Sequence, residues 1–218
     1  MDYSGPDAAD FAEVAALNQA FLVCLRAPAG ARLRGRLPEP LQPAMAALRD
    51  VQVERLARTP FLLLTLRERD AGYWRQLAGE QSEPDLFAPG GNGGDDIAAA
   101  ALSFLWHLAR RNPYALRLVA GAGNDWCSML LDSTLLGLLR SIASQADILL
   151  PREAGNGEFW RKLLGPGLSA DPTVRAAAHT ACLQTILTDL PESAPMLRAA
   201  ARRSLPPRYR AAAVQRPG

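Results

Sequence analysis

The sequence contains two histidines, His107 and His179, and the hydrophobic periodicity places each of them within a predicted helix. Imidazole is the side chain best suited to proton transfer and metal binding near neutral pH. Neither histidine belongs to an HExxH motif, and no cysteine or acid stands at metal-ligand spacing beside it. We therefore expect helix histidines satisfied by their neighbours, and we predict no metal site and no cofactor.

The three cysteines, Cys24, Cys127 and Cys182, are odd in number, far apart and free of any CxxC pairing. This argues against a disulfide framework and favours a reducing compartment. Cys182 follows His179 by three positions and shares a helix face with it, and a pairing of Cys127 with His107 is the alternative for a thiolate nucleophile. Cysteine among alanines is more typical of a small buried hydrophobe, so we lean towards a non-catalytic protein.

A glycine-rich segment, residues 90–94, precedes a predicted helix, which is the arrangement that cradles phosphate groups. No strand precedes it, and Asp95 and Asp96 place carboxylates where the phosphate would bind. The sequence therefore predicts an acidic surface loop. Asp95, Asp96, Asp125 and Asp132 could bind a divalent metal if their helices converge, although helix capping accounts for acids at helix starts.

Aromatic side chains offer a second kind of site, an apolar pocket between helices. The residues proposed to line it are the four tryptophans and one of the histidines: Trp74, Trp106, Trp126, Trp160 and His107. The same aromatic side chains at helical spacing also fit an ordinary core. The pattern gives no indication of the ligand.

Lys162 is the one lysine among the 24 basic residues, and this bias towards arginine is typical of a GC-rich bacterial genome. Two arginine-rich stretches, residues 26–36 and 198–216, contain no acid and could contact a nucleic acid or an acidic protein. The contact candidates in the second stretch are Arg198, Arg202, Arg203, Arg208 and Arg210. A solvated, frayed tail over residues 206–218 is the alternative, and the net charge of +2 favours no particular partner class.

Helical periodicity dominates the chain, and strict two-residue alternation is almost absent. The spacing predicts helices over residues 7–26, 43–59, 97–111, 113–119, 126–149, 158–164, 171–190 and 196–205. The run 61–66 fits a buried strand or the start of a helix, and we favour a helix continuing to residue 77. The fold class is all-α, an irregular bundle of about seven to nine helices.

Residues 1–205 are predicted to form a single helical domain, with a subdomain break near residues 80–96. Residues 171–178 resemble the opening of a HEAT-repeat helix, which would imply a helical solenoid. A solenoid repeats its unit at intervals of about 40 residues, and no second copy occurs at that spacing.

The function predicted first is a non-catalytic helical interaction or regulatory protein in the cytoplasm, with no membrane attachment. We expect it to form a homo-oligomer, or to hold a protein partner, through an apolar helix face, for which residues 126–149 are the leading candidate. One alternative is a nucleic-acid-binding regulator that uses the arginine stretches, although nucleic acid is the less favoured partner. The other is an enzyme or small-ligand binder with the tryptophan-lined pocket.

Overall fold

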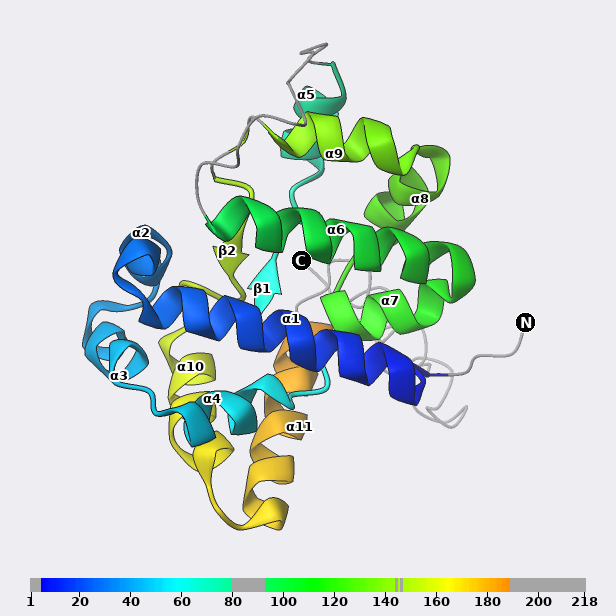
Figure 1. Cartoon of the computed structure of the whole chain (residues 1–218). Coiled ribbons are helices and arrows are strands. Elements are labelled where there is room, and N and C mark those ends of the chain that lie inside the picture. The colour runs from blue at the N-terminus through cyan, green and yellow to red at the C-terminus, as the bar shows by residue number, and fades with distance from the viewer. Residues whose placement is uncertain (1–4, 80–92, 144, 146, 189–218) are drawn as a thin grey trace, which may run out of the picture.

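The computed structural model describes residues 5–79, 93–143, 145 and 147–188. These residues form eleven α-helices, three short 3-10 helices and one two-stranded antiparallel ladder, which confirms the all-α fold class. Helices α1 and α6 pack side by side. In the view of Figure 1, α5, α8 and α9 lie beyond α6, α3, α4, α10 and α11 lie beyond α1, and β1, β2 and α7 appear between the two helices.

The element bounds follow the chain in order. The first part contains α1 (Ala8–Arg26), η1 (Pro28–Gly30), α2 (Ala31–Arg34), η2 (Glu39–Leu41), α3 (Gln42–Ala46), α4 (Asp50–Ala57), β1 (Leu64–Thr65) and α5 (Ala71–Gly79). The second part contains α6 (Gly93–Arg111), α7 (Pro113–Ala120), α8 (Asn124–Asp132), α9 (Leu135–Ala143), β2 (Leu150–Pro151), α10 (Gly157–Leu164), η3 (Pro166–Leu168) and α11 (Pro172–Thr188). Strands β1 and β2 pair with Leu64 opposite Pro151 and Thr65 opposite Leu150.

Helix α1 begins where the sequence predicts, because Asp7 accepts a hydrogen bond from the amide of Asp10 in a capping box. By length and composition alone, α1 is apolar enough to cross a membrane, a test that core helices of folded proteins also pass. Here Val14, Phe21 and Leu25 are completely buried against neighbouring helices. The helix therefore supplies part of the protein core.

The segment 61–66 is not helical: the chain bends at Phe61 and Leu63 and then forms β1. The helix that we favoured over residues 61–77 is therefore wrong up to residue 70, and its last part is present as α5. Distant side chains take up its backbone hydrogen bonds: Asn18 Nδ2 donates to the carbonyl of Phe61, and the amide of Leu63 donates to Asn18 Oδ1. The amide of Leu62 donates to the carbonyl of Val119. Because the backbone N–H and C=O groups of this segment form hydrogen bonds with residues outside it, the segment does not need a helix to pair them.

Two predicted helices are each divided. The single helix expected over residues 126–149 breaks after α8, where Thr134 Oγ1 accepts from the amide of Gly137 and starts α9 as its cap. The helix expected over residues 43–59 is divided between α3 and α4, where Gln52 accepts from the amide of Arg49. These two breaks and the additional short helix α2 raise the number of helices above the predicted seven to nine.

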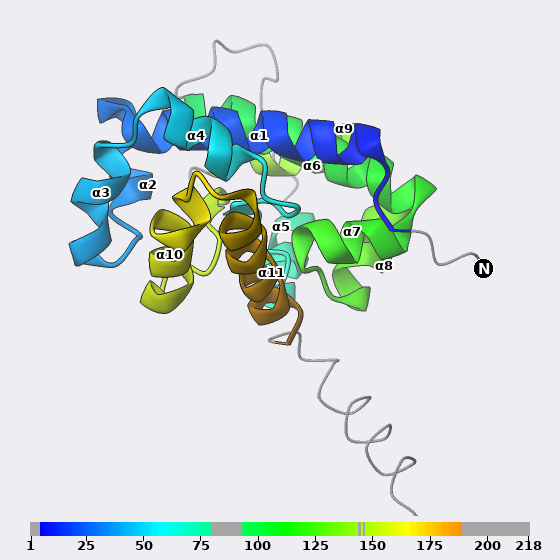
Figure 2. The same cartoon turned by 90° about the horizontal axis from the view of Figure 1, so that it is seen from below.

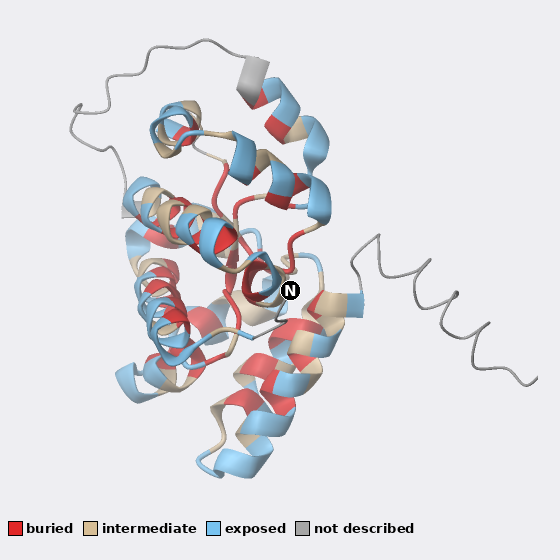
Figure 3. Cartoon of the chain, turned by 90° about the vertical axis from the view of Figure 1, so that its right-hand side faces the viewer, coloured by how far each residue is buried: buried red, intermediate tan, exposed pale blue. Residues whose placement is uncertain are grey.

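The buried side chains form one continuous core, which follows the inner faces of the helices (Figure 3). Helix α11 packs against α10 and η3 at one side of the molecule (Figure 2). Residues 80–92 and 189–218 lie outside the described residues. The predicted glycine-rich loop falls largely in the first of these ranges, and the arginine tail falls in the second.

Candidate functional site

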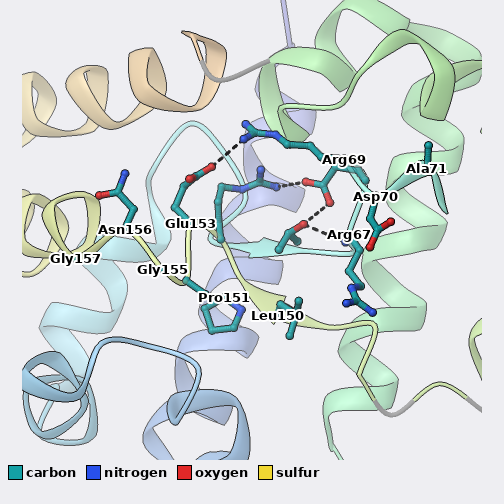
Figure 4. Close-up of a pocket in the computed structure, with 14 residues that line it drawn as sticks. Arg67, Arg69, Asp70, Ala71, Leu150, Pro151, Glu153, Gly155, Asn156 and Gly157 are labelled. Atoms are coloured by element: carbon teal, nitrogen blue, oxygen red, sulfur yellow. Dashed lines mark hydrogen bonds and ion pairs between the residues drawn. The ribbon is translucent and has the colours of Figure 1, made fainter. Parts of the chain in front are cut away.

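A polar cleft lies between two turns, each of which connects a strand of the ladder to a helix (Figure 4). Turn 1, residues 67–70, joins β1 to α5, and turn 2, residues 153–156, joins β2 to α10. The cleft has a volume of about 880 Å³. Its floor includes Thr65 and Pro151, one residue from each strand.

The two turns share an unusual backbone. Arg67 and Glu153 open them with φ values of 57° and 49°, the two left-handed residues other than glycine in the described part of the chain. This conformation is uncommon for residues with a Cβ, and each instance costs about 1–3 kcal/mol. In both turns the fourth residue donates its amide to the carbonyl of the first, from Asp70 to Arg67 and from Asn156 to Glu153, at 2.8 Å in each case.

The last residue of each turn caps the helix that follows. Asp70 Oδ1 accepts from the amide of Tyr73, and Asn156 Oδ1 accepts from the amide of Phe159, each at 3.0 Å. Ala71 and Gly157, the first residues of α5 and α10, both line the cleft. The amino-terminal ends of two helices therefore meet at one cavity. The oxygens of the capping side chains partly offset the partial positive charges of these helix ends.

A tryptophan in each helix fixes the backbone behind the turn. Trp74 Nε1 donates to the carbonyl of Leu66 at 3.0 Å, and Trp160 Nε1 donates to the carbonyl of Arg152 at 2.8 Å. Both indole rings are buried. The two turns are thus held from behind by the same kind of bond at the same place.

The wall behind the cleft contains a buried ion pair between Arg152 and Glu68, whose side chains are only 3% and 2% exposed. Arg152 Nη2 donates to Glu68 Oε1 at 2.7 Å, and other guanidinium N–H groups donate to the carbonyls of Leu62, Leu64 and Ala120. Glu68 Oε2 accepts from the amide of Leu66 and the hydroxyl of Thr65. Such complete pairing is what makes buried charges tolerable.

The rim of the cleft carries two more ion pairs. Arg69 Nη1 contacts Glu153 Oε1 at 3.1 Å, so that this pair joins turn 1 to turn 2. The same guanidinium donates to the carbonyls of Gly121 and Ile186, which connects the rim to the end of α11. Arg67 pairs with Asp147 at 3.1 Å.

Tyr73 lies beside the Arg67 pair, with the guanidinium carbon 4.2 Å from its ring centroid. Its hydroxyl is 3.3 Å from Asp147 Oδ1. Burial, together with the neighbouring Asp147 carboxylate, raises the pKa of Tyr73 above its ordinary value. The phenol thus remains protonated, and it can donate a hydrogen bond to the carboxylate that balances Arg67.

Comparison of the chain with protein-family models, curated proteins and solved structures gives no match. Counted over the lining residues, three arginines (Arg67, Arg69 and Arg152) stand against three carboxylates (Glu68, Asp70 and Glu153). The cleft is formally neutral but carries groups of both signs.

The predicted aromatic pocket residues lie in three separate places. Trp74 and Trp126 form an edge-to-face pair at 5.8 Å, and Trp74 borders a small groove of about 220 Å³ between α5, α8 and α9. Trp160 is fully buried against Phe159. Trp106 lies on α6, where its ring is partly buried 5.0 Å from His107 and its Nε1 donates to the carbonyl of Ser133. The four tryptophans therefore do not meet in one cavity.

His107 and Trp106 line a second cavity of about 810 Å³ between α1 and α6. It contains Asp10 and Arg111, which form an ion pair with each other. His107 is exposed, and it lies on a different face from the cleft between the turns. Its role as a ligand-pocket residue stays a prediction.

His179 and Cys182 lie on α11, with His179 Nε2 buried and without a hydrogen-bond partner in the described residues. Burial lowers the pKa of His179 and raises that of Cys182 to about 11. The thiol is therefore protonated at neutral pH, and its Sγ lies 3.8 Å from the carbonyl of Phe159. This environment is that of a core cysteine rather than a nucleophile. In the described residues, no group of three potential metal ligands comes together.

Two arginines of the first basic stretch bind backbone carbonyls. Arg34 Nη1 donates to the carbonyls of Leu25 and Ala27 at the end of α1, and Arg26 binds the carbonyl of Leu48 and the carboxylate of Asp50. None of the charged residues that line the cleft was predicted as a site residue from the sequence. A signal was nevertheless present, because the dipeptide Trp74-Arg75 recurs as Trp160-Arg161 with leucine two positions after each.

Proposed function

We propose that the protein is a non-catalytic, regulatory binding protein that holds a small polar ligand in the cleft between turn 1 and turn 2. One observation carries the proposal: both turns open with a left-handed residue that is not glycine, at Arg67 and Glu153, on facing sides of one cavity. Strain of this kind persists only where surrounding contacts enforce it, and it is concentrated at binding and switch sites.

The chemistry of the lining favours binding over catalysis. A general base needs a free lone pair and a pKa suited to its task. Glu68 is saturated by Arg152, Leu66 and Thr65, and Glu153 is held by Arg69. The contacts of Glu68 and Glu153 therefore stabilise the two turns and leave these carboxylates poorly suited to act as general bases.

The neutral balance of the lining favours a ligand that carries both charge signs. A zwitterion can place its anionic group towards Arg67 in turn 1 and its cationic group towards Glu153 in turn 2, so that both walls contribute to binding. A ligand with charges of one sign only would be attracted by one of these two residues and repelled by the other. An α-amino acid or a short peptide has the required chemistry.

Thermal unfolding in the presence of zwitterionic, dianionic and polycationic small molecules tests this proposal. A ligand at 100 times its Kd stabilises the folded state by about 2.7 kcal/mol, a measurable rise in Tm. Gly155→Tyr is the blocking variant, because a Cβ at Gly155 meets nothing within 4 Å and the ring can fill the cleft. Gly5→Tyr is the matched control, since Gly5 is equally unobstructed and lies outside the cleft.

We expect a zwitterion to raise the Tm of the wild type and of Gly5→Tyr but not of Gly155→Tyr. A panel that leaves the wild type unchanged contradicts the proposal. A ligand that stabilises Gly155→Tyr as strongly as the wild type contradicts the location of the site.

We also propose self-association through the outer side of α8 and α9, as expected from the apolar sequence of residues 126–149. Leu131 and Leu136 support it, because 42% and 50% of these residues are exposed to solvent. A second copy of the chain is the partner that we propose for this face.

A further inference from the structure

The order of elements occurs twice along the chain. Two long helices, α1 and α6, each begin a half, and each is followed by short helical segments, a helix of about two turns, a strand and a terminal helix. Strands β1 and β2 are separated by 86 positions, counted from Leu64 to Leu150. The same separation relates Trp74 to Trp160 and Leu77 to Leu163, which are all buried.

Details of the two turns follow the same separation. It relates the left-handed residues Arg67 and Glu153, and it relates the capping residues Asp70 and Asn156. It also relates the carbonyls of Leu66 and Arg152, which accept the two indole hydrogen bonds. Equivalent residues in the two halves therefore make equivalent hydrogen bonds.

Packing repeats as well. Helix α1 contacts α2, α3 and α4 within the first half, and α6 contacts α7, α8 and α9 within the second half. Between the halves, α1 packs on α6, and β1 pairs with β2. The terminal helices are exchanged: α5 contacts α9 and, through the Trp74–Trp126 ring pair, α8, whereas α10 contacts η2 of the first half (Figure 1).

We infer that the chain is an internal duplication, in which residues 8–79 and 94–165 are two copies of one unit arranged like the subunits of a dimer around a local two-fold axis through the β1–β2 ladder. An antiparallel pair of equivalent strands is the arrangement that a two-fold axis produces. The segment η3–α11 is an addition that follows the second copy.

This arrangement identifies the cleft as a composite site shared by the two copies. Six pairs of equivalent positions line it, namely 65 with 151, 67 with 153, 68 with 154, 69 with 155, 70 with 156 and 71 with 157. The backbone of the two walls is alike, so the difference between the walls comes from their side chains. Turn 1 contributes Arg67 and Arg69, whereas turn 2 has Glu153 and Gly155 at the same positions. A ligand that contacts both walls therefore meets cations on one side and an acid with open space on the other.

The inference goes beyond the proposed function and does not depend on it, because it is tested without a ligand. In the full chain, residues 70–77 are replaced by the sequence of residues 156–163. This graft keeps Trp74, Arg75 and Leu77, and it introduces Asp70→Asn, Ala71→Gly, Gly72→Glu, Tyr73→Phe and Gln76→Lys. A control graft places the sequence of residues 134–141 there instead, which is also a capped helix, with Leu138 falling at the buried position 74.

We expect the equivalent graft to unfold cooperatively, with a Tm within about 5 °C of the wild type, because cap, buried rings and indole hydrogen bond are all retained. The control graft should unfold at least about 5 °C below the equivalent graft, since it loses the Trp74 ring with its bond to Leu66 and replaces the buried Leu77 with serine. Equal Tm values for the two grafts would overturn the inference. An equivalent graft that fails to fold would also overturn it, whereas failure of every ligand in the thermal assay would affect only the proposed function.

Discussion

The replacement Arg152→Leu tests the buried ion pair most directly. Leucine is the residue that the first half carries at the equivalent position, Leu66, so its size and polarity suit this part of the fold. The change removes three hydrogen bonds, to the carbonyls of Leu62, Leu64 and Ala120, and the ion pair with Glu68. Loss of one partner from a buried pair costs about 3–5 kcal/mol, because it leaves a charge unpaired in the core.

We expect urea unfolding followed by circular dichroism to give a free energy of unfolding lower by that amount, with a fall in Tm of roughly 6–20 °C for a chain of this size. Arg26→Leu is the matched control. Its side chain is 31% exposed, donates to the carbonyl of Leu48 and pairs with the side chain of Asp50, which is 84% exposed. A surface pair of this kind contributes no more than about 1 kcal/mol.

The double variant Glu68→Gln with Arg152→Leu separates the unpaired charge from the lost hydrogen bonds. Glutamine keeps an oxygen that can accept from Leu66 and Thr65, but it brings no charge into the core. We expect the double variant to recover about 1–3 kcal/mol relative to Arg152→Leu. The reasoning is refuted if Arg152→Leu is as stable as Arg26→Leu, or if the double variant is no more stable than Arg152→Leu alone.

Two further predictions concern pH and self-association. Burial lowers the pKa of His179, so the unfolded chain binds a proton that the folded chain does not as the pH falls below about 6.5; the free energy of unfolding should therefore decrease on acidification. Urea midpoints at pH 7.5 and 5.5 should show a smaller difference for His179→Leu than for the wild type, and an equal difference would exclude His179 as a contributor. Sedimentation velocity should show a concentration-dependent oligomer that Leu136→Glu disrupts and Val23→Glu, at a similarly exposed position of α1, leaves intact. A wild type that sediments as a monomer at all concentrations contradicts self-association.

The sequence predicts elements whose ends depend on neighbouring residues. Asp7 caps α1 through Asp10, and Pro113 opens α7 after the Asn112 cap, because capping is decided within one helical turn. The conformation of residues 61–66 could not be predicted from neighbouring residues. Its partners are Asn18, Arg152 and the carbonyl of Val119, and no local pattern in the run records them.

The cleft escaped prediction for a related reason. Its charged residues lie in two short turns, where arginine and glutamate have the appearance of ordinary surface residues. The recurring Trp-Arg dipeptide was a readable signal, but the 86-position separation is about twice the repeat length of a helical solenoid. Once the chain folds, the pairing of β1 with β2 brings Arg69 to Glu153 and Glu68 to Arg152, which connects the two halves directly.

These connections imply how a ligand would affect the whole molecule. Turn 1 leads into α5, which contacts α9 and Trp126 of α8, while turn 2 leads into α10, which contacts η2 of the first half and α11. A ligand that contacts both turns therefore contacts the starts of both α5 and α10. Each of these helices packs against the half of the chain to which it does not belong. Arg69 extends the same contact to the carbonyl of Ile186 near the end of α11. A ligand can shift the protein between two conformations only if it binds one of them more tightly. The strained turns are the part of the cleft where we expect two such conformations to differ.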